Sequence, residues 1–479
     1  MNGRPSTSRN TLVSLADTVG RQAIQFGFTI ILARLLAPEE FGLLAMLAIF
    51  IGLASVMAEG GLGVALIQRQ ATTPLEESSV FYFNAAIGAA MTLLLALAAP
   101  YIAMLYGEPR LVAISAAMSL NVLFNALGAI HVALLVREGR LGVQLRIGLL
   151  ASVLSGSFGV ALALRGYGAW SLVGQSLLGS ATFTALLWAS HRWRPVRAFS
   201  MQALRPLLHY SVPLMASGVL DAGFGRLHTL LIGRLHGASS LGLYMRASTT
   251  QQLPQIMLSS AMQRVALPAM AARQRDGAHM LAFTRASLRS ASLLYLPAML
   301  GMAAIAEPLV PFLFGPGWAP SIPVLQVLCL AGTLYPLHQI NLILLKAMGH
   351  SRLFLRLEVL KKSVLVALLL VAVPMGLLAV AWSTVGAGLV AVAINGHYTR
   401  RLVGYGLSAQ LRDFAPFLGV ALAMAGVVWW LGQAITFGPA TELLAQAAAG
   451  ILVYGGACLG LGLITLGELR AAVTGVDAR

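Results

Sequence analysis

The residues of this sequence best suited to chemistry are arginines that lie inside long apolar segments. Arg21, Arg226 and Arg264 each occur in a stretch that is long enough to enter a lipid bilayer. A charge in the hydrocarbon of a membrane is costly, so such residues usually face a wet cavity or an ionic partner. We therefore interpret these three arginines as candidate ligands of an anionic substrate.

Two polar stripes accompany these arginines. Gln25 lies one helical turn after Arg21, on a stripe that also includes Asp17 and Thr29 at helical spacing. Gln252 and Gln255 belong to a second stripe in the segment that ends near Arg264. We predict that Gln25, Gln252 and Gln255 bind substrate, and that the two stripes face a cavity between two halves of the protein.

Three carboxylates in the apolar segments are candidates for ion coupling or ion pairing: Asp17, Glu59 and Asp221. Asp17 precedes Arg21 by four residues, so the two can pair on one face of a helix instead of lining a cavity. Glu59 is followed by two glycines. This pattern fits either coupling to a proton or cation, or a break in the helix that leaves Glu59 near the inner headgroups.

Other polar residues of the segments have two interpretations. Arg34, Arg234 and Arg246 lie near predicted helix ends, where long side chains extend to the headgroups. Five further polar residues are expected either to line the cavity or to form hydrogen bonds between helices. They are Asn121, Asn125, His338, Gln339 and Asn341. Cys329 and Cys458 lie in apolar segments and are expected to be small core residues.

The composition requires a membrane protein. The chain has 479 residues, of which 58% are hydrophobic and 10% charged, with a mean hydropathy of +0.81. Such a sequence has more apolar surface than a soluble core can bury. We predict an all-α polytopic fold with about fourteen transmembrane helices. They are expected near 11–36, 41–67, 79–104, 110–135, 143–164, 168–190, 207–236, 240–268, 284–314, 319–345, 355–374, 377–398, 413–434 and 443–467.

The distribution of positive charge predicts the orientation. If the N-terminus is cytoplasmic, the outer loops contain only Arg110 and Arg165, while the inner loops are rich in arginine and lysine. This bias places both termini in the cytoplasm. The net charge of +16 is then explained by loops that face anionic lipid headgroups, so no nucleic-acid partner is needed. We expect no cleavable signal peptide, because the first apolar segment contains Asp17 and Arg21.

Short sequences recur in the two halves in the same order. Residues 33–43 match 233–243, 64–66 match 265–267, and 170–174 match 382–386. An internal repeat of this kind is characteristic of transporters. We predict a six-helix lobe at 1–190, a basic cytoplasmic connector at 191–206, a second six-helix lobe at 207–402, and two extra helices with a short tail at 403–479. The connector is expected to be either an amphipathic strap on the inner leaflet or a solvated loop.

No catalytic signature was found. The sequence lacks a phosphate-binding Gly-Lys motif, a His-Glu-x-x-His motif and a nucleophile elbow, and its loops are short. It also shows no metal-ligand spacing. We therefore expect a protein that is not an enzyme and that needs no cofactor, with a proton or sodium ion as the candidate coupling ion.

The sequence resembles the Wzx-type polysaccharide flippases of the multidrug/oligosaccharidyl-lipid/polysaccharide (MOP) exporter superfamily, in particular the O-antigen, colanic-acid and teichuronic-acid branch. The stretches that carry this resemblance are LADTVGRQAIQFGFTIILARLLAPEEFGLLAM at 15–46, EGGLGVALIQR at 59–69, YGAWSLVGQ at 167–175 and GRLHGASSLGLYMRA at 233–247. In the related lipid II flippases, arginines of the first, second and eighth helices hold pyrophosphate. Arg21 and Arg264 match the first and eighth positions, and the second helix has no counterpart.

The resemblance implies alternating access and a function in the bacterial inner membrane. The expected substrate is an undecaprenyl-pyrophosphate-linked oligosaccharide repeat unit, moved to the outer leaflet for lipopolysaccharide or exopolysaccharide synthesis. Expected partners are this lipid-linked oligosaccharide, the membrane lipids and a polysaccharide polymerase or export machinery. The alternative is a cation-coupled exporter of drugs or other small molecules from the same superfamily.

Overall fold

The computed structural model describes residues 7–69, 71–272, 276–434 and 438–463, except for the side chains of 7–19, 21, 261, 264, 265, 351, 352 and 439. Every regular element in these ranges is a helix, which confirms the predicted all-α class. The elements are α1 (Thr7–Leu35), α2 (Pro38–Glu59), α3 (Leu62–Gln68), α4 (Pro74–Tyr106), α5 (Leu111–Arg137), α6 (Leu141–Leu164), α7 (Ala169–Ser190), α8 (Met201–Ala271), α9 (Gly277–Ala304), α10 (Ala306–Phe314), η1 (Pro316–Ser321), α11 (Ile322–Gly332), α12 (Tyr335–Ala347), α13 (Ser351–Ala372), η2 (Val373–Met375), α14 (Leu377–Val403), α15 (Leu407–Ala434) and α16 (Pro439–Gly460).

Many of these helices are long and apolar enough to cross a membrane. Within the described residues, eight helices meet this criterion, and two bent helix pairs could each add one span. The pairs are α9 with α10, bent by 77°, and Pro316–Gly332 with Tyr335–Ala347, bent by 41°. The chain is therefore a multi-pass membrane protein. In the described part of the chain, helices occur in all fourteen segments expected from hydropathy, while the number of membrane spans stays a prediction.

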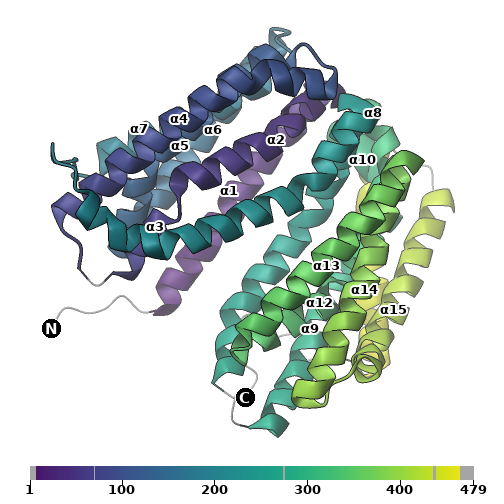
Figure 1. Cartoon of the computed structure of the whole chain (residues 1–479). Helices are drawn as coiled ribbons and strands as arrows, with labels where there is room; N and C mark the ends of the chain where they lie inside the picture. Colours follow the sequence, from purple (N-terminus) through teal and green to yellow (C-terminus); the bar gives the residue numbers. More distant parts are fainter. Residues whose placement is uncertain (1–6, 70, 273–275, 435–437, 464–479) are drawn as a thin grey trace. The chain divides into compact units, whose positions relative to one another are not determined.

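The chain folds into two compact units, Met1–Gly242 and Leu243–Arg479. In the first unit α4 packs against α5 and α6 against α7, and in the second α9 packs against α15 and α13 against α14 (Figure 1). The division falls inside α8, because the N-terminal part of this helix packs with the first unit. The lobes predicted at 1–190 and 207–402 with their connector therefore stay predictions.

Glycines set two helix boundaries that bear on the candidate site. The break between α2 and α3 is made by Gly60 and Gly61, whose φ angles of 55° and 69° lie in the left-handed region. Other residues rarely adopt this conformation, whereas glycine does so at no steric cost. In α8, Gly237 has a φ of 78° and a ψ of 179°, so it separates the two predicted segments 207–236 and 240–268.

A reciprocal pair of glycines joins α2 to α8 within the first unit. A Cβ atom on Gly42 would lie 1.8 Å from the carbonyl oxygen of Ala238, and one on Gly242 would lie 1.9 Å from the carbonyl oxygen of Pro38. Gly42 and Gly242 are equivalent positions of the sequence repeat, as are Pro38 and Ala238. The two helices thus approach each other backbone to backbone, which only glycine permits.

The segment between α7 and α8 is tied to the first unit. The Val196 amide donates to the Ser78 hydroxyl at 2.9 Å, and the Ser200 amide donates to the Ser79 hydroxyl at 3.0 Å. The Trp193 ring packs edge-on against Phe81, with ring centroids 5.9 Å apart. Residues 191–200 are therefore a non-helical segment anchored on α4, while the choice between an amphipathic strap on the inner leaflet and a solvated loop stays a prediction.

Buried polar side chains in the second unit join its helices. Asn341 and Gln410 exchange two amide hydrogen bonds of 2.9 and 3.0 Å, and Thr399 donates to Asn341 at 2.8 Å. His338 contacts Asn395 at 3.1 Å. Such bonds satisfy polar groups that have no access to water. For this unit the interhelical interpretation of the polar residues is confirmed.

We expected the Arg246 side chain to extend to the surface, but it is buried. Its residue surface is 5% exposed, and its guanidinium lies 4.9 Å from the ring centroids of both Phe314 and Trp318. Aromatic faces attract a cation, so the two rings replace the headgroups as its surroundings. Arg34 and Arg234, in contrast, are exposed near their helix ends, as the prediction requires.

Candidate functional site

A charged cavity of about 670 Å³ lies in the first unit, between α2, α5 and the N-terminal part of α8. Among the described residues, three ionisable side chains line it: Glu59, Asp221 and Arg226. The structure thereby brings Glu59 together with Asp221 and Arg226, two predicted site residues of α8 that lie more than 160 positions further along the sequence. The rest of the lining is apolar or small, and consists of Leu44, Ala48, Ile51, Gly52, Ser55, Val56, Met118, Ala222 and Gly225.

Gly52 gives the guanidinium of Arg226 its position. A Cβ atom on Gly52 would lie 1.5 Å from Arg226 Nη1 and 2.7 Å from its Cζ. The guanidinium therefore lies directly against the backbone of α2, and no other residue type at position 52 would leave this space free. Arg226 is half-buried in this arrangement. Its planar group offers several N–H donors in a fixed fork, which is suited to binding phosphate or carboxylate oxygens.

The helix break places Glu59 at the cavity. Glu59 is the last residue of α2, and an added Cβ on Gly61 would lie 3.3 Å from the carbonyl oxygen of Ser211, so the break packs closely against α8. The predicted break is confirmed. Because Glu59 also lines the cavity, its coupling role stays a prediction, as does that of Asp221.

The charges of this cavity favour binding of an anion together with a cation. Two carboxylates face one guanidinium in the cavity lining. An incoming anion is attracted by Arg226 and repelled by ionised Glu59 and Asp221. Uptake of a proton or a metal cation by the carboxylates removes this repulsion. The arrangement can therefore link anion binding to cation binding.

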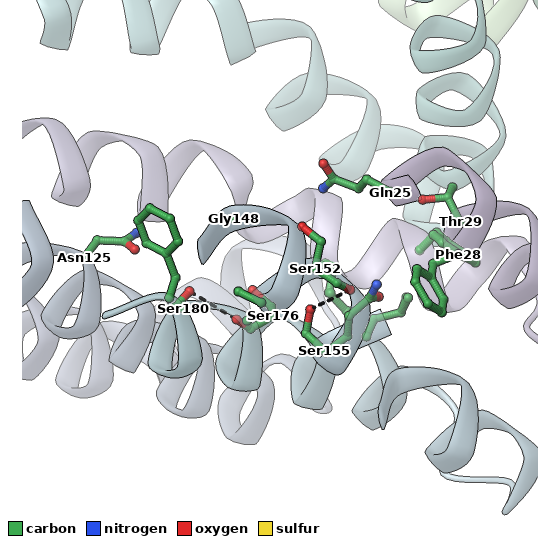
Figure 2. A pocket seen from close by; sticks show the side chains of 16 residues that line it. Gln25, Phe28, Thr29, Asn125, Gly148, Ser152, Ser155, Ser176 and Ser180 are labelled. Atoms are coloured by element: carbon green, nitrogen blue, oxygen red, sulfur yellow. Dashed lines mark hydrogen bonds between the residues drawn. The ribbon is translucent and has the colours of Figure 1, made fainter. Parts of the chain in front are cut away.

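A second cavity of about 500 Å³ lies in the same unit, and none of the described residues that line it is charged, so we call it the uncharged cavity. Figure 2 shows Gln25 and Thr29 at one end of this cavity and Asn125 at the other, with serines between them. Leu44 lines both cavities, so they adjoin. The described residues of the lining are Gln25, Phe28, Thr29, Phe41, Leu44, Asn125, Gly148, Ala151, Ser152, Ser155, Leu172, Gln175, Ser176, Gly179, Ser180 and Phe183.

The two asparagines of α5 have different roles in this region. The Asn121 side-chain oxygen accepts hydrogen bonds from Ser180 at 2.6 Å and Ser176 at 3.3 Å, so Asn121 joins α5 to α7. Asn125 lies one turn further on and lines the second cavity. Asn121 therefore forms hydrogen bonds between helices, whereas Asn125 forms part of a cavity wall.

The structure does not describe the side chains of three predicted site residues. Asp17 and Arg21 belong to α1 and Arg264 to α8, but their side chains lie outside the described residues. Their roles, including the choice between cavity lining and an Asp17–Arg21 pair, stay predictions.

The glutamines of the second stripe belong to the second unit. Gln252 is exposed and donates to Ser248 at 2.9 Å, while Gln255 is half-buried. Their role in substrate binding stays a prediction, as does the cavity between the halves. Within the described residues, no three His, Cys, Asp or Glu side chains gather as a metal site.

Two features of the site were not predicted from the sequence. Gly52 was not singled out, because the position of one glycine in an apolar helix does not show which side chain lies against it. The polar wall of the second cavity was also missed, although it has a sequence signal. Ser152 and Ser155 in α6, and Gln175, Ser176 and Ser180 in α7, repeat at intervals that place each set on one helix face.

Comparison with solved structures defines the class of fold. The lipid II flippase MurJ, in an inward closed conformation, superposes with a TM-score of 0.75 over 93% of this chain and 97% of its own, at 16% sequence identity. A multidrug resistance MATE family transporter of the MOP superfamily, in its inward-facing conformation, gives a TM-score of 0.62 over 82% of this chain and 96% of its own, also at 16% identity. The chain therefore has the fold of these membrane transport proteins.

Sequence comparison defines the family. The polysaccharide biosynthesis protein family matches residues 31–323. The succinoglycan biosynthesis transport protein ExoT of Rhizobium meliloti is 30% identical over 69% of this chain and 67% of its own length. The lipopolysaccharide biosynthesis protein WzxC of Escherichia coli is 28% identical over 64% of this chain and 62% of its own length, which is less than two thirds. The chain belongs to the polysaccharide biosynthesis protein family, and the predicted resemblance to Wzx-type proteins is confirmed.

Proposed function

We propose that this protein is a flippase for a polyprenyl-pyrophosphate-linked oligosaccharide. It would move the repeat unit of a surface polysaccharide from the inner to the outer leaflet of the bacterial cytoplasmic membrane. In this proposal both termini are cytoplasmic, no bond is made or broken, and a polysaccharide polymerase or export machinery receives the product. The family membership supports the substrate class, and so do the names of two relatives, a succinoglycan biosynthesis transport protein and a lipopolysaccharide biosynthesis protein.

The observation that carries the proposal is the guanidinium of Arg226 in a cavity of an apolar helical unit. A pyrophosphate headgroup cannot enter hydrocarbon unaided, because desolvation of its charges costs too much free energy. A polyprenyl tail, in contrast, can stay among the lipids. The protein must therefore supply a polar, cationic environment for the headgroup alone, and Arg226 supplies a bidentate donor for phosphate oxygens.

The carboxylates of the cavity supply a means of coupling. Glu59 and Asp221 line the same cavity as Arg226, so binding of pyrophosphate would favour their neutralisation by a proton or by sodium. Entry of this cation with the substrate would link flipping to an ion gradient. Substrate transport in vesicles should then respond to a proton or sodium gradient, and Glu59→Gln with Asp221→Asn should remove the response.

Flipping can be measured with purified protein in vesicles that contain a fluorescent polyprenyl-pyrophosphate oligosaccharide, using a membrane-impermeant quencher. The wild type should transfer the lipid between leaflets. Arg226→Ala should slow transfer by about tenfold to a hundredfold, because it removes a charged hydrogen-bond donor. Arg226→Lys should have an intermediate rate, since the charge remains and the fork is lost.

Arg234→Ala is the matched control, because Arg234 is an exposed arginine of the same helix. It should leave the rate unchanged. No transfer by the wild type, combined with gradient-dependent export of small cationic dyes, would contradict the proposal and favour the drug exporter. Equal transfer rates for the wild type and Arg226→Ala would show that Arg226 does not bind the pyrophosphate during transfer.

A further inference from the structure

We propose that the uncharged cavity of the first unit binds the carbohydrate part of the substrate. This inference rests on the proposed function, since it assumes that the substrate is a glycosylated lipid. It assigns to the two adjoining cavities different parts of one molecule: the charged cavity takes the pyrophosphate, and the uncharged cavity takes sugar.

The lining has the hydrogen-bonding chemistry of a sugar site. Sugar hydroxyls donate and accept hydrogen bonds, and so do the amide and hydroxyl side chains of this cavity. An ionised side chain would favour an ion instead, and among the side chains that the structure describes none of this kind lines the cavity. The volume of about 500 Å³ lies within the range of roughly 300–1,000 Å³ that is typical of ligand pockets.

Much of this hydrogen-bonding capacity is unused. In the described part of the chain, no protein hydrogen bond engages the side chains of Gln25, Thr29, Asn125 or Gln175. A polar group inside a membrane protein is costly without a partner, so these side chains must be met by water or by a ligand. They come from α1, α5 and α7, and therefore reach the cavity from several directions (Figure 2).

Other residues of the lining are held in place. Ser176 and Ser180 donate to Asn121, which lies behind the cavity wall. A Cβ on Gly156 would lie 2.3 Å from Cδ2 of Phe28, so the missing side chain leaves room for this ring at the cavity. An aromatic ring offers a flat apolar face to the C–H groups of a sugar. The cavity thus combines fixed apolar and polar surfaces with free amide groups.

The junction of the cavities supports the same assignment. Leu44 lines both, so the two cavities meet at this side chain. In a polyprenyl-pyrophosphate oligosaccharide, the first sugar is bonded directly to the pyrophosphate. Adjacent sites for an anion and for an uncharged polar group match this covalent order.

The test compares two probes bound to the full-length protein in nanodiscs: polyprenyl pyrophosphate without sugar, and the lipid-linked oligosaccharide extracted from the strain that contains this gene. Dissociation constants are measured by native mass spectrometry. The wild type should bind the glycosylated lipid more tightly. Asn125→Leu combined with Gln175→Leu should weaken this binding by about tenfold, which corresponds to the loss of one to two hydrogen bonds, and leave binding of the bare lipid unchanged.

Two further variants keep the test conclusive. Gln25→Ala changes an exposed residue of the lining, so it tests the cavity even if the double variant does not fold. Asn84→Leu makes the same type of change at a buried asparagine of α4 outside the lining, and should leave both affinities unchanged. Arg226→Ala should weaken binding of both probes.

Other outcomes separate the two proposals. If the wild type binds both lipids equally, or if the cavity variants weaken both equally, the cavity holds only water and the carbohydrate site is wrong, while pyrophosphate recognition stands. If the wild type binds neither lipid, the proposed function fails and the carbohydrate site fails with it.

Discussion

Arg226 shows how much one side chain depends on the residue that faces it. The sequence places a cation in an apolar segment, but the direction of its side chain is set by the missing side chain of Gly52. Long side chains in membrane segments can otherwise extend toward the interface. The glycine therefore determines whether the guanidinium lines the cavity.

This dependence predicts the effect of Gly52→Ala. The new Cβ would occupy the position of Arg226 Nη1, so the guanidinium must move away. The cost to folding is small because the displaced group is the end of a flexible side chain. Flipping in the vesicle assay should therefore fall about as far as for Arg226→Ala, roughly tenfold or more.

Gly223→Ala is the control for this variant, because a Cβ at Gly223 meets no heavy atom within 4 Å. Its rate should equal that of the wild type. A Gly52→Ala protein with a normal rate would show that the close contact of Arg226 with α2 has no functional importance.

Arg246 gives a prediction about stability. Arg246→Ala removes two cation–π contacts of about 0.5–2 kcal/mol each and leaves a cavity between Phe314 and Trp318. The variant should unfold at a lower temperature in detergent, as followed by intrinsic fluorescence. Arg234→Ala, at an exposed arginine, should change the free energy of unfolding by no more than about 0.5 kcal/mol. Equal midpoints for the two variants would mean that the aromatic contacts of Arg246 do not stabilise the fold.

Side-chain environments of this kind could not be obtained from the sequence. Asn121 and Asn125 occupy successive turns of α5, yet one bonds to serines of α7 and the other lines a cavity. Sequence spacing identified both as inward-facing polar residues but could not distinguish these two outcomes. The distinction depends on which side chain of a neighbouring helix lies opposite each of them.

At the scale of the helix, local signals were reliable. The glycine pair after Glu59 indicated the break at Gly60, and the gap between the predicted segments 207–236 and 240–268 contains Gly237; both glycines have a positive φ. The connector between α7 and α8 was harder to predict, because its attachment comes from the hydroxyls of Ser78 and Ser79 in a distant helix. Its basic composition indicated only that it lies outside the membrane.

A second anchor of the connector involves Glu138 and His191. His191 Nδ1 accepts from the Trp193 amide at 3.1 Å, which leaves Nε2 to donate to Glu138 at 3.1 Å. Burial alone would raise the pKa of Glu138, but the hydrogen bond from His191 and the contact with Arg140 outweigh it, so this pKa lies below its ordinary value of 4.5. The anchor therefore favours the ionised carboxylate.

The sign of the pH effect follows from this shift. A lowered pKa in the folded state contributes stability that is present above about pH 4.5 and is lost as the pH falls through the folded value. The unfolding midpoint of the wild type should decrease on acidification in this window. Glu138→Gln retains an acceptor oxygen without the titrating group, so its decrease should be smaller. Parallel pH profiles for the two proteins would contradict the role of this anchor.

At the scale of the whole molecule, hydropathy and charge were the informative quantities. They predicted a polytopic all-α protein, and each of the fourteen predicted segments contains helix wherever its residues are described. The cavities could not be predicted in the same way, because each is lined by residues from several helices. The segment 15–46 illustrates this limit: its polar stripe was evident, but the residues of α5, α6 and α7 that line the same cavity as Gln25 were not.

The predicted orientation can be tested with single cysteines in a protein that carries Cys329→Ala and Cys458→Ala. Both natural cysteines are buried and free, so their removal leaves a background without reactive thiols. Tyr167→Cys lies in a predicted outer loop and should react with an impermeant maleimide in intact spheroplasts. Val196→Cys lies in the connector and should react only after permeabilisation. The opposite labelling pattern would show that the predicted orientation is wrong and that the connector lies outside the cytoplasm.

The contact of Gly42 with Ala238 and of Gly242 with Pro38 has a consequence for the history of the gene. If the chain arose by duplication of a shorter ancestor, positions 42 and 242 descend from one codon, and each now limits what the other helix can tolerate. Mutations accumulate independently in the two copies elsewhere, but here neither copy can acquire a side chain. This pair should therefore be among the last traces of the ancestral sequence to disappear.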